Sequence, residues 1–165
     1  MGDKGRQIVK MNVGELIEKL NSAFADEWLA YYQYWVSARI ASGWRREAAA
    51  GEFEEHAQDE LKHAGMLADR IIQLGGTPIS NFLEVNDKAN CKYINPSDSD
   101  TMALLKQGVD GERCAIEVYN KLLGELKDKD PITYHIILEI LEDEVDHEED
   151  FQSLLEESKK RGARR

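Results

Sequence analysis

The stretches that decide the fold are DELKHAGML (residues 59–67) and DEVDHEEDF (residues 143–151). Each contains a glutamate followed three residues later by a histidine, namely Glu60 with His63 and Glu144 with His147. Residues three apart share one face of a helix, so each pair presents a carboxylate and an imidazole side by side. One such pair is weak evidence in a glutamate-rich chain, but two pairs on separate helical segments indicate a metal site between helices.

Four segments around these motifs have the apolar periodicity of amphipathic helices. The first begins at Asn12, a good N-cap residue, and the second stops before the glycines that start at Gly75. The polar run 97–100 supplies N-cap residues for the third. The fourth opens at Asp130, and Pro131 follows at a position where proline is tolerated. The predicted helices span about residues 12–42, 44–74, 99–127 and 131–159.

The lengths of the connections predict how these helices are arranged. Helices one and two, and helices three and four, are joined by a few residues, so each pair is expected to be antiparallel. Residues 77–96 separate helices two and three, and about 20 extended residues reach about 66 Å. A helix of roughly 28 residues is roughly 42 Å long, so this linker can return along the bundle. We expect an all-α four-helix bundle, two antiparallel hairpins joined by a long crossover, in a single domain over residues 1–165.

The first helix of each hairpin offers a further carboxylate. Glu27 lies 33 residues before Glu60, and Glu112 lies 32 residues before Glu144. A dinuclear carboxylate site needs one glutamate from each of these helices. Glu112 has competitors nearby in Asp110 and Glu117. The predicted metal ligands are Glu27, Glu60, His63, Glu112, Glu144 and His147.

The surroundings of the two added glutamates also match. Tyr34 follows Glu27 by seven residues, and Tyr119 follows Glu112 by seven, which indicates an internal two-fold repeat. An unpaired carboxylate such as Glu27 on an apolar helix face is costly unless a metal or a hydrogen bond satisfies it, and the hydroxyls of Tyr31 and Tyr34 on the same face are an alternative to metal. We expect Tyr34 near the metals, either as an electron donor or as a hydrogen-bond partner of a ligand.

The type of ligand predicts the type of metal. Four carboxylates with two imidazoles suit iron or manganese better than zinc, which favours closed sites of nitrogen and sulfur. We therefore expect two iron ions per subunit, and manganese suits the same ligands.

The charge of the whole chain limits its partners. The 165 residues have a net charge of −11, which argues against general binding to DNA and to anionic membranes. The N-terminus lacks the apolar core of a signal peptide, so we expect a cytoplasmic protein. The basic tail, residues 158–165, is either a solvated helix end or an arm for DNA or another acidic partner.

Beyond these patterns, the chain resembles a known family. DEWLAYYQYWVSAR (residues 26–39), with Glu27, Gln33, Tyr34 and Arg39, is similar to the first helix of bacterioferritins, and the two Glu-x-x-His stretches are similar to their second and fourth. GERCAIEVY (residues 111–119) is most similar to the Dps-like, or thioferritin, branch. The resemblance implies a ferritin-like bundle with ferroxidase activity. Such a protein oxidises Fe(II) with peroxide or O₂, stores ferric mineral in a homo-oligomeric shell and protects against oxidative stress.

Departures from bacterioferritins refine this expectation. Leu61 stands where bacterioferritins have the methionine that binds haem, so no haem is expected. Few residues follow the fourth helix, which favours a shell of twelve subunits over one of twenty-four. By resemblance, Glu55 and Asp59 guide iron between cavity and site, whereas the alternative is an ordinary solvated acidic face.

The two cysteines, Cys91 and Cys114, are 23 residues apart, a separation compatible with a bridge. Closing such a loop stabilises a protein by roughly 3 kcal/mol in the chain-entropy model. The family resemblance implies instead a redox pair beside the metals. Two unrelated thiols are the third interpretation.

Three other functions compete with the ferroxidase. A rubrerythrin-like peroxidase or a dimanganese catalase would use the same ligands without a storage cage, although the paired Cys-x-x-Cys motifs of rubredoxin modules are absent from this sequence. An architectural DNA-binding protein would use the basic tail. A structural bundle would hold no metal.

Overall fold

The structure is a computed structural model that describes residues 3–162, with side chains described as far as residue 157. Over that range the chain folds into helices joined by loops, which confirms the all-α prediction. The helices are α1 (Asp3–Gln7), α2 (Val13–Ile40), α3 (Arg46–Leu74), the 3₁₀ helix η1 (Phe82–Glu84), α4 (Val85–Lys88), α5 (Thr101–Leu126) and α6 (Pro131–Gly162). The four long helices begin and end within three residues of the predicted bounds.

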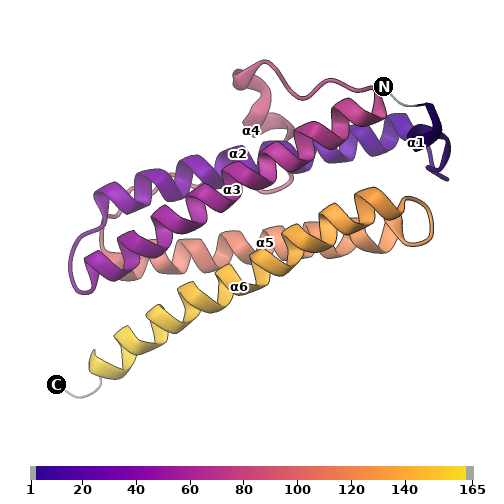
Figure 1. Ribbon diagram of the computed structural model, residues 1–165. Coiled ribbons are helices and arrows are strands. Elements are labelled where there is room, and N and C mark those ends of the chain that lie inside the picture. Colours follow the sequence, from indigo (N-terminus) through magenta and orange to yellow (C-terminus); the bar gives the residue numbers. More distant parts are fainter. Residues whose placement is uncertain (1–2, 163–165) are drawn as a thin grey trace.

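The long helices form two hairpins that pack into a bundle. Helix α2 packs along α3 and α5 packs along α6, and the crossover between α3 and α5 passes along the outer side of α2 (Figure 1). This is the predicted arrangement of two antiparallel hairpins joined by one long connection. It brings the middle of all four helices together, and the predicted ligands lie at that level.

The ends of the helices follow from residues identified in the sequence. The Asn12 side chain accepts hydrogen bonds from the N–H groups of Gly14 and Glu15 and so caps α2. The Asp130 carboxylate accepts from the N–H groups at the start of α6 in the same way. Gly75 ends α3 with φ of 89°, a left-handed conformation that glycine adopts at little cost.

The crossover contains structure that the sequence did not predict. Helices η1 and α4 are too short for an apolar periodicity to be read, and α1 is missed for the same reason. Val85 of α4 and Ala89, which directly follows α4, are buried against Ala25 of α2, and this contact attaches the crossover to the outside of the bundle. The crossover therefore lies close to Glu27, two residues further along α2.

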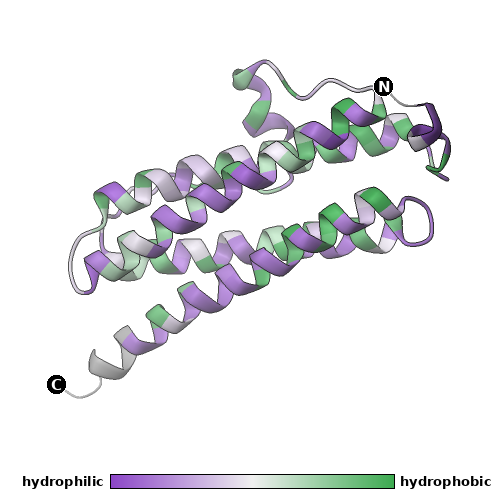
Figure 2. Ribbon diagram, in the orientation of Figure 1, coloured by the Kyte–Doolittle hydropathy of each residue, from purple (hydrophilic) through white to green (hydrophobic). Residues whose placement is uncertain are grey.

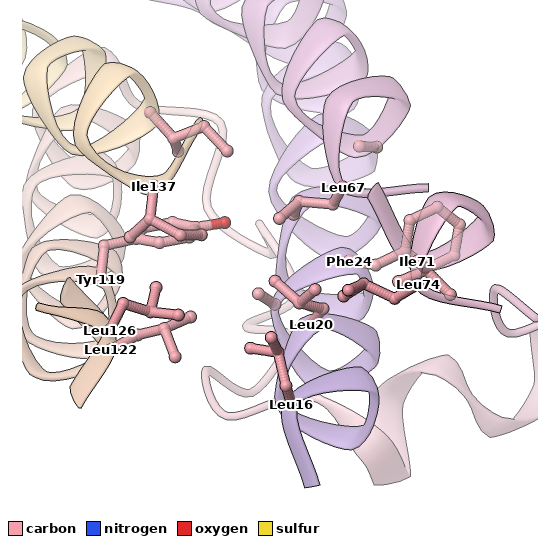
Figure 3. Close-up of a cluster of buried hydrophobic side chains, with 13 residues drawn as sticks. Leu16, Leu20, Phe24, Leu67, Ile71, Leu74, Tyr119, Leu122, Leu126 and Ile137 are labelled. Atoms are coloured by element: carbon pink, nitrogen blue, oxygen red, sulfur yellow. The ribbon is translucent and has the colours of Figure 1, made fainter. Parts of the chain in front are cut away.

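The apolar core is divided into two parts by the layer of predicted ligands. One cluster joins the start of α2 and the end of α3 to the end of α5 and the start of α6, and Figure 3 shows its side chains pointing toward one another from both hairpins. A second cluster, around Tyr34, Phe53 and Phe151, lies on the other side of the ligands. The same division is visible along α6, whose first turns are mostly apolar and whose middle is mostly hydrophilic (Figure 2).

Two further points concern membrane spans and the basic tail. None of the helices between residues 3 and 162 combines the length and apolar character of a membrane span. The side chains of the predicted basic tail, residues 158–165, lie outside the described part of the chain, so its role stays a prediction.

Candidate metal centre

The structure brings the six predicted ligands together at the centre of the bundle. Each hairpin supplies three of them, and none has more than 4% of its surface exposed. They come from all four long helices, namely Glu27 on α2, Glu60 and His63 on α3, Glu112 on α5, and Glu144 and His147 on α6.

The ligands form two overlapping groups of four. In one group Glu27 and His63 join Glu60 and Glu144, and in the other Glu112 and His147 join the same two carboxylates. Within each group, one donor atom of every residue lies within 4.8 Å of the others. Two cations can therefore bind side by side, sharing the carboxylates of Glu60 and Glu144.

Both imidazoles point the same ring nitrogen at this centre. The Nδ1 atom of His63 lies 3.3 Å from Glu27 Oε2, 3.4 Å from Glu60 Oε2 and 3.3 Å from Glu144 Oε1. The Nδ1 atom of His147 lies 3.6 Å from Glu60 Oε1 and 3.9 Å from Glu112 Oε1. These separations leave room for a cation between each nitrogen and its carboxylates.

An aspartate lies next to the Nε2 atom of each imidazole, the ring nitrogen that faces away from the centre. His63 Nε2 is 2.9 Å from Asp143 Oδ2, and His147 Nε2 is 3.5 Å from Asp59 Oδ2. Each aspartate directly precedes the glutamate of the opposite hairpin's Glu-x-x-His pair. An acidic partner on the outer nitrogen orients an imidazole and raises its basicity as a ligand. Asp143 was not predicted, because its contact crosses between hairpins.

Two buried tyrosines hold the terminal carboxylates, again across the hairpins. The Tyr119 hydroxyl of α5 donates a hydrogen bond to Glu27 of α2. The Tyr34 hydroxyl of α2 is hydrogen-bonded to Glu112 of α5. A side chain at Gly111 would approach the Tyr34 hydroxyl to 3.1 Å, so glycine leaves space for this contact. The predicted repeat therefore corresponds to a reciprocal pair of contacts.

Hydrogen bonds within the site do not satisfy all of its buried atoms. Among the described residues, oxygens of all four glutamates and Nδ1 of His147 are buried without a hydrogen-bond partner. An unsatisfied buried polar atom costs free energy, and several converging on one point are satisfied by a cation. These atoms fit a pair of metal ions.

The charge state of the site supports the same interpretation. Burial raises the pKa of Glu60 and of Glu112 well above the usual range. A neighbouring carboxylate adds to each increase, Glu27 in the case of Glu60 and Glu144 in the case of Glu112. Burial and Glu60 raise the pKa of Glu144 to about 8. Burial opposes ionisation of Glu27 too, but the adjacent His63 imidazole holds its pKa below the usual value. Without metal, protons neutralise the site, and cations that bind replace them.

Two further residues that were expected to guide iron lie on the outer face of α3. Glu55 is exposed, and Asp59 is partly buried against His147. The structure thus gives Asp59 a contact with a ligand, while a route for iron along this face stays a prediction. Leu61 is 43% exposed on the same helix. The expectation that no haem is bound also stays a prediction.

Cys91 and Cys114 form a disulfide, which excludes two unrelated thiols and is compatible with both the stabilising bridge and the redox pair. Cys91 lies in the crossover, where its backbone N–H donates a 2.7 Å hydrogen bond to Asp26 Oδ1. Burial raises the pKa of Asp26 to about 7. A cavity of about 40 Å³ lies next to Cys91, and the carboxylates of Glu27 and Glu112 also line it. The disulfide therefore borders a space that reaches the metal ligands.

Comparison with known proteins places these features in a family. The sequence model of the ferritin-like domain matches residues 17–160. The DNA protection during starvation protein of Pyrococcus furiosus is 33% identical over 160 residues, which cover 94% of this chain and 86% of that protein. The bacterioferritin of Brucella melitensis is 29% identical over 137 residues, 81% of this chain and 78% of that protein.

Solved structures show the same relationship. The bacterioferritin-related protein of Bacteroides fragilis, described as a dodecameric thioferritin, superposes with a TM-score of 0.96. It is 41% identical, and the match covers 98% of each chain. Dps from Thermosynechococcus elongatus shares the fold with a TM-score of 0.81 at 14% identity, over 86% of this chain and 90% of that one.

Proposed function

Because the chain belongs to the ferritin-like domain family, we propose that it is a ferroxidase that oxidises Fe(II) at a dinuclear centre and stores the ferric product. The observation that supports this function best is the pair of ligand groups sharing Glu60 and Glu144. Iron storage and ferroxidase activity are typical of the family, whereas the dinuclear chemistry is our inference from the geometry. Protection from oxidative stress would follow from removing Fe(II) and oxidant together.

The donor set suits iron in both of its oxidation states. Negative carboxylates favour Fe(III) over Fe(II), which promotes oxidation at the site. Two Fe(II) ions bound side by side supply the two electrons that reduce one peroxide to water, so no one-electron oxygen radical is released. Manganese fits the same oxygen and nitrogen ligands.

The protein's contribution is to position the ligands and to exclude bulk water. Tyr34 and Tyr119 orient the terminal carboxylates, and the two aspartates orient the imidazoles. The apolar clusters on both sides of the layer keep the centre away from solvent. A pre-oriented, buried ligand set avoids the cost of reorganisation when cations bind.

The cavity beside the disulfide is suited to the oxidant. Its volume of about 40 Å³ exceeds the roughly 10–15 Å³ that one water molecule needs, so it can hold O₂ or peroxide. Its lining contains carboxylates of the centre together with Cys91. In the reduced, dithiol state, Cys91 and Cys114 would supply two electrons and two protons to a peroxide and re-form the disulfide, which is the redox role that the sequence resemblance implies.

We also infer that the product is stored in a closed shell of identical subunits. The Bacteroides fragilis relative is described as dodecameric, and it covers 98% of this chain at 41% identity. The net charge of −11 favours attraction of cations to such a shell. Glu55 and Asp59 would lie on a path for iron toward the centre.

Loss of either shared carboxylate tests the ferroxidase assignment. We expect Glu60→Ala and Glu144→Ala each to reduce iron oxidation to the uncatalysed rate, because both cations lose a common ligand. The measurement is the rate of Fe(III) formation after mixing anaerobic Fe(II) with peroxide or O₂.

Glu142→Ala is the matched control, because it removes an exposed carboxylate two residues before Glu144 on the same helix. It should oxidise iron at the wild-type rate. Circular dichroism should show unchanged helix content in all three variants. Wild-type rates in both Glu60→Ala and Glu144→Ala would rule out the proposed centre.

A further inference from the structure

A second cluster of metal-binding side chains lies between α3 and α6, just outside the six ligands. Glu52 and His56 are four residues apart on α3 and therefore share a face, and Asp150 faces them from α6. His56 Nε2 lies 3.8 Å from Glu52 Oε2 and 3.6 Å from Asp150 Oδ2. One donor atom of each of the three residues lies within 4.8 Å of the others.

These distances are those of atoms around a cation rather than of hydrogen bonds. Imidazole nitrogens and carboxylate oxygens bind transition metals at about 2.0–2.2 Å. Two such donors at a tetrahedral angle are then about 3.4 Å apart, close to the separations observed. Small rotations of the partly exposed Glu52 and Asp150 side chains would bring their oxygens to binding distance of a cation shared with His56.

His56 is a buried imidazole without a hydrogen bond. Only 2% of its surface is exposed, and its Nδ1 is buried without a partner. Both carboxylate oxygens lie beyond hydrogen-bond distance of its Nε2. Burying an imidazole in this way costs free energy that a bound cation can offset. Stacking on His147, with ring centroids 4.0 Å apart, and contact with Phe151 at 4.4 Å hold the ring in place.

The two carboxylates converge although they repel each other. Burial and the charges of Asp150 and Glu55 raise the pKa of Glu52. Asp150 is itself 55% exposed, so a cation can reach the cluster from solvent. Like charges held together around an imidazole are stabilised by a positive ion.

From this arrangement we propose that Glu52, His56 and Asp150 form a third cation site, which takes a divalent transition metal ion beside the dinuclear centre. One ring nitrogen of His56 also lies within 4.8 Å of donor atoms of Glu112 and His147, so this residue links the two sites. The third site lies between α3 and α6, whereas the cavity that borders the disulfide is lined mainly from α2, the crossover and α5, together with the shared ligands Glu60 and Glu144.

Zinc binding tests this proposal without any redox reaction. We would crystallise metal-free protein with a small excess of Zn²⁺ and locate the ions by anomalous scattering. The wild type should show three zinc ions per chain, one of them bound by His56, Glu52 and Asp150. Zinc titration of the double variant Glu52→Gln/Asp150→Asn should give two ions per chain, or a third bound at least about tenfold more weakly. Glu149→Gln, which removes a neighbouring exposed charge on α6, should bind three.

The outcomes separate this inference from the proposed function. Two zinc ions at the dinuclear centre and none at His56 would overturn the third site and leave the ferroxidase intact. A third ion held by His56 together with Glu112 and His147 would also overturn it, because His56 would then belong to the central cluster. No zinc at the six central ligands would contradict the proposed function itself, whatever the third site binds.

Discussion

At the scale of single residues, the contacts around the ligands are as informative as the ligands themselves. The spacing of Glu60 and His63 is local, so the sequence predicts that they share a helix face. The partners Asp143 and Tyr119 reach their ligands across the bundle, and no spacing within one helix indicates such a contact. His56 was missed because it has no glutamate three residues before it.

The tyrosines give a prediction at this scale. We expect Tyr119→Phe and Tyr34→Phe each to slow iron oxidation by roughly ten- to a hundred-fold, because each leaves a ligand carboxylate without its orienting partner. Stopped-flow measurements of Fe(III) formation would compare the two variants. Tyr32→Phe is the control, since Tyr32 is 49% exposed.

Electron paramagnetic resonance would distinguish the two roles considered for Tyr34. If Tyr34 also donates an electron, the radical signal formed during oxidation should vanish in Tyr34→Phe and persist in Tyr119→Phe. Unchanged rates and signals in both variants would contradict any role for these hydroxyls beyond packing.

At the scale of helices, the end of α3 is tied to the start of α6 by a buried ion pair. The Arg70 guanidinium lies 2.8 Å from Asp130, and it also donates a 2.7 Å hydrogen bond to Thr133. Burial opposes ionisation of Asp130, but hydrogen bonds from Thr133 and Arg70 hold its pKa below the usual 3.8. Asp130 therefore caps α6 and joins the two hairpins at once.

We expect Asp130→Asn to lower the free energy of unfolding at pH 7 by about 3–5 kcal/mol, because Arg70 is left buried without a counter-charge. The depressed pKa means that this contribution is complete above pH 3.8 and is lost as pH falls through the lower folded-state pKa. The stability difference between wild type and variant should therefore shrink in acid. Urea unfolding of metal-free protein at several pH values measures it.

Asp128→Asn removes an exposed charge two residues away and should change stability little at any pH. A difference between wild type and Asp130→Asn that stays constant from neutral pH to pH 2 would argue against the ion pair.

The helices were predictable where a capping residue or a strong apolar period marks them. Asn12, Gly75 and Asp130 mark ends that the structure reproduces. The crossover helices were not predictable, because η1 and α4 depend on packing against α2 rather than on a pattern of their own. The disulfide depends on the same packing, which brings the Cα atoms of Cys91 and Cys114 to 6.0 Å.

At the scale of the whole molecule, the prediction concerns assembly. We expect light scattering at neutral pH to give the mass of twelve chains of 18.8 kDa, because the 41% identical relative is described as a dodecamer and this chain has almost the same fold. Twenty-four chains would keep the storage shell and change its size. A monomer or a simple dimer would remove storage from the proposed function and favour the peroxidase or catalase alternative.

The contacts that cross between the hairpins limit which amino-acid substitutions this protein can accept during evolution. Tyr34 with Glu112, Tyr119 with Glu27 and His63 with Asp143 each join one hairpin to the other. A hairpin transplanted from a related protein would bring only one residue of each contacting pair. It would work only where the other hairpin of this chain carries the residue that matches it. The two halves of the chain are therefore expected to be inherited as a unit, and substitutions in one to be tolerated only alongside substitutions in the other.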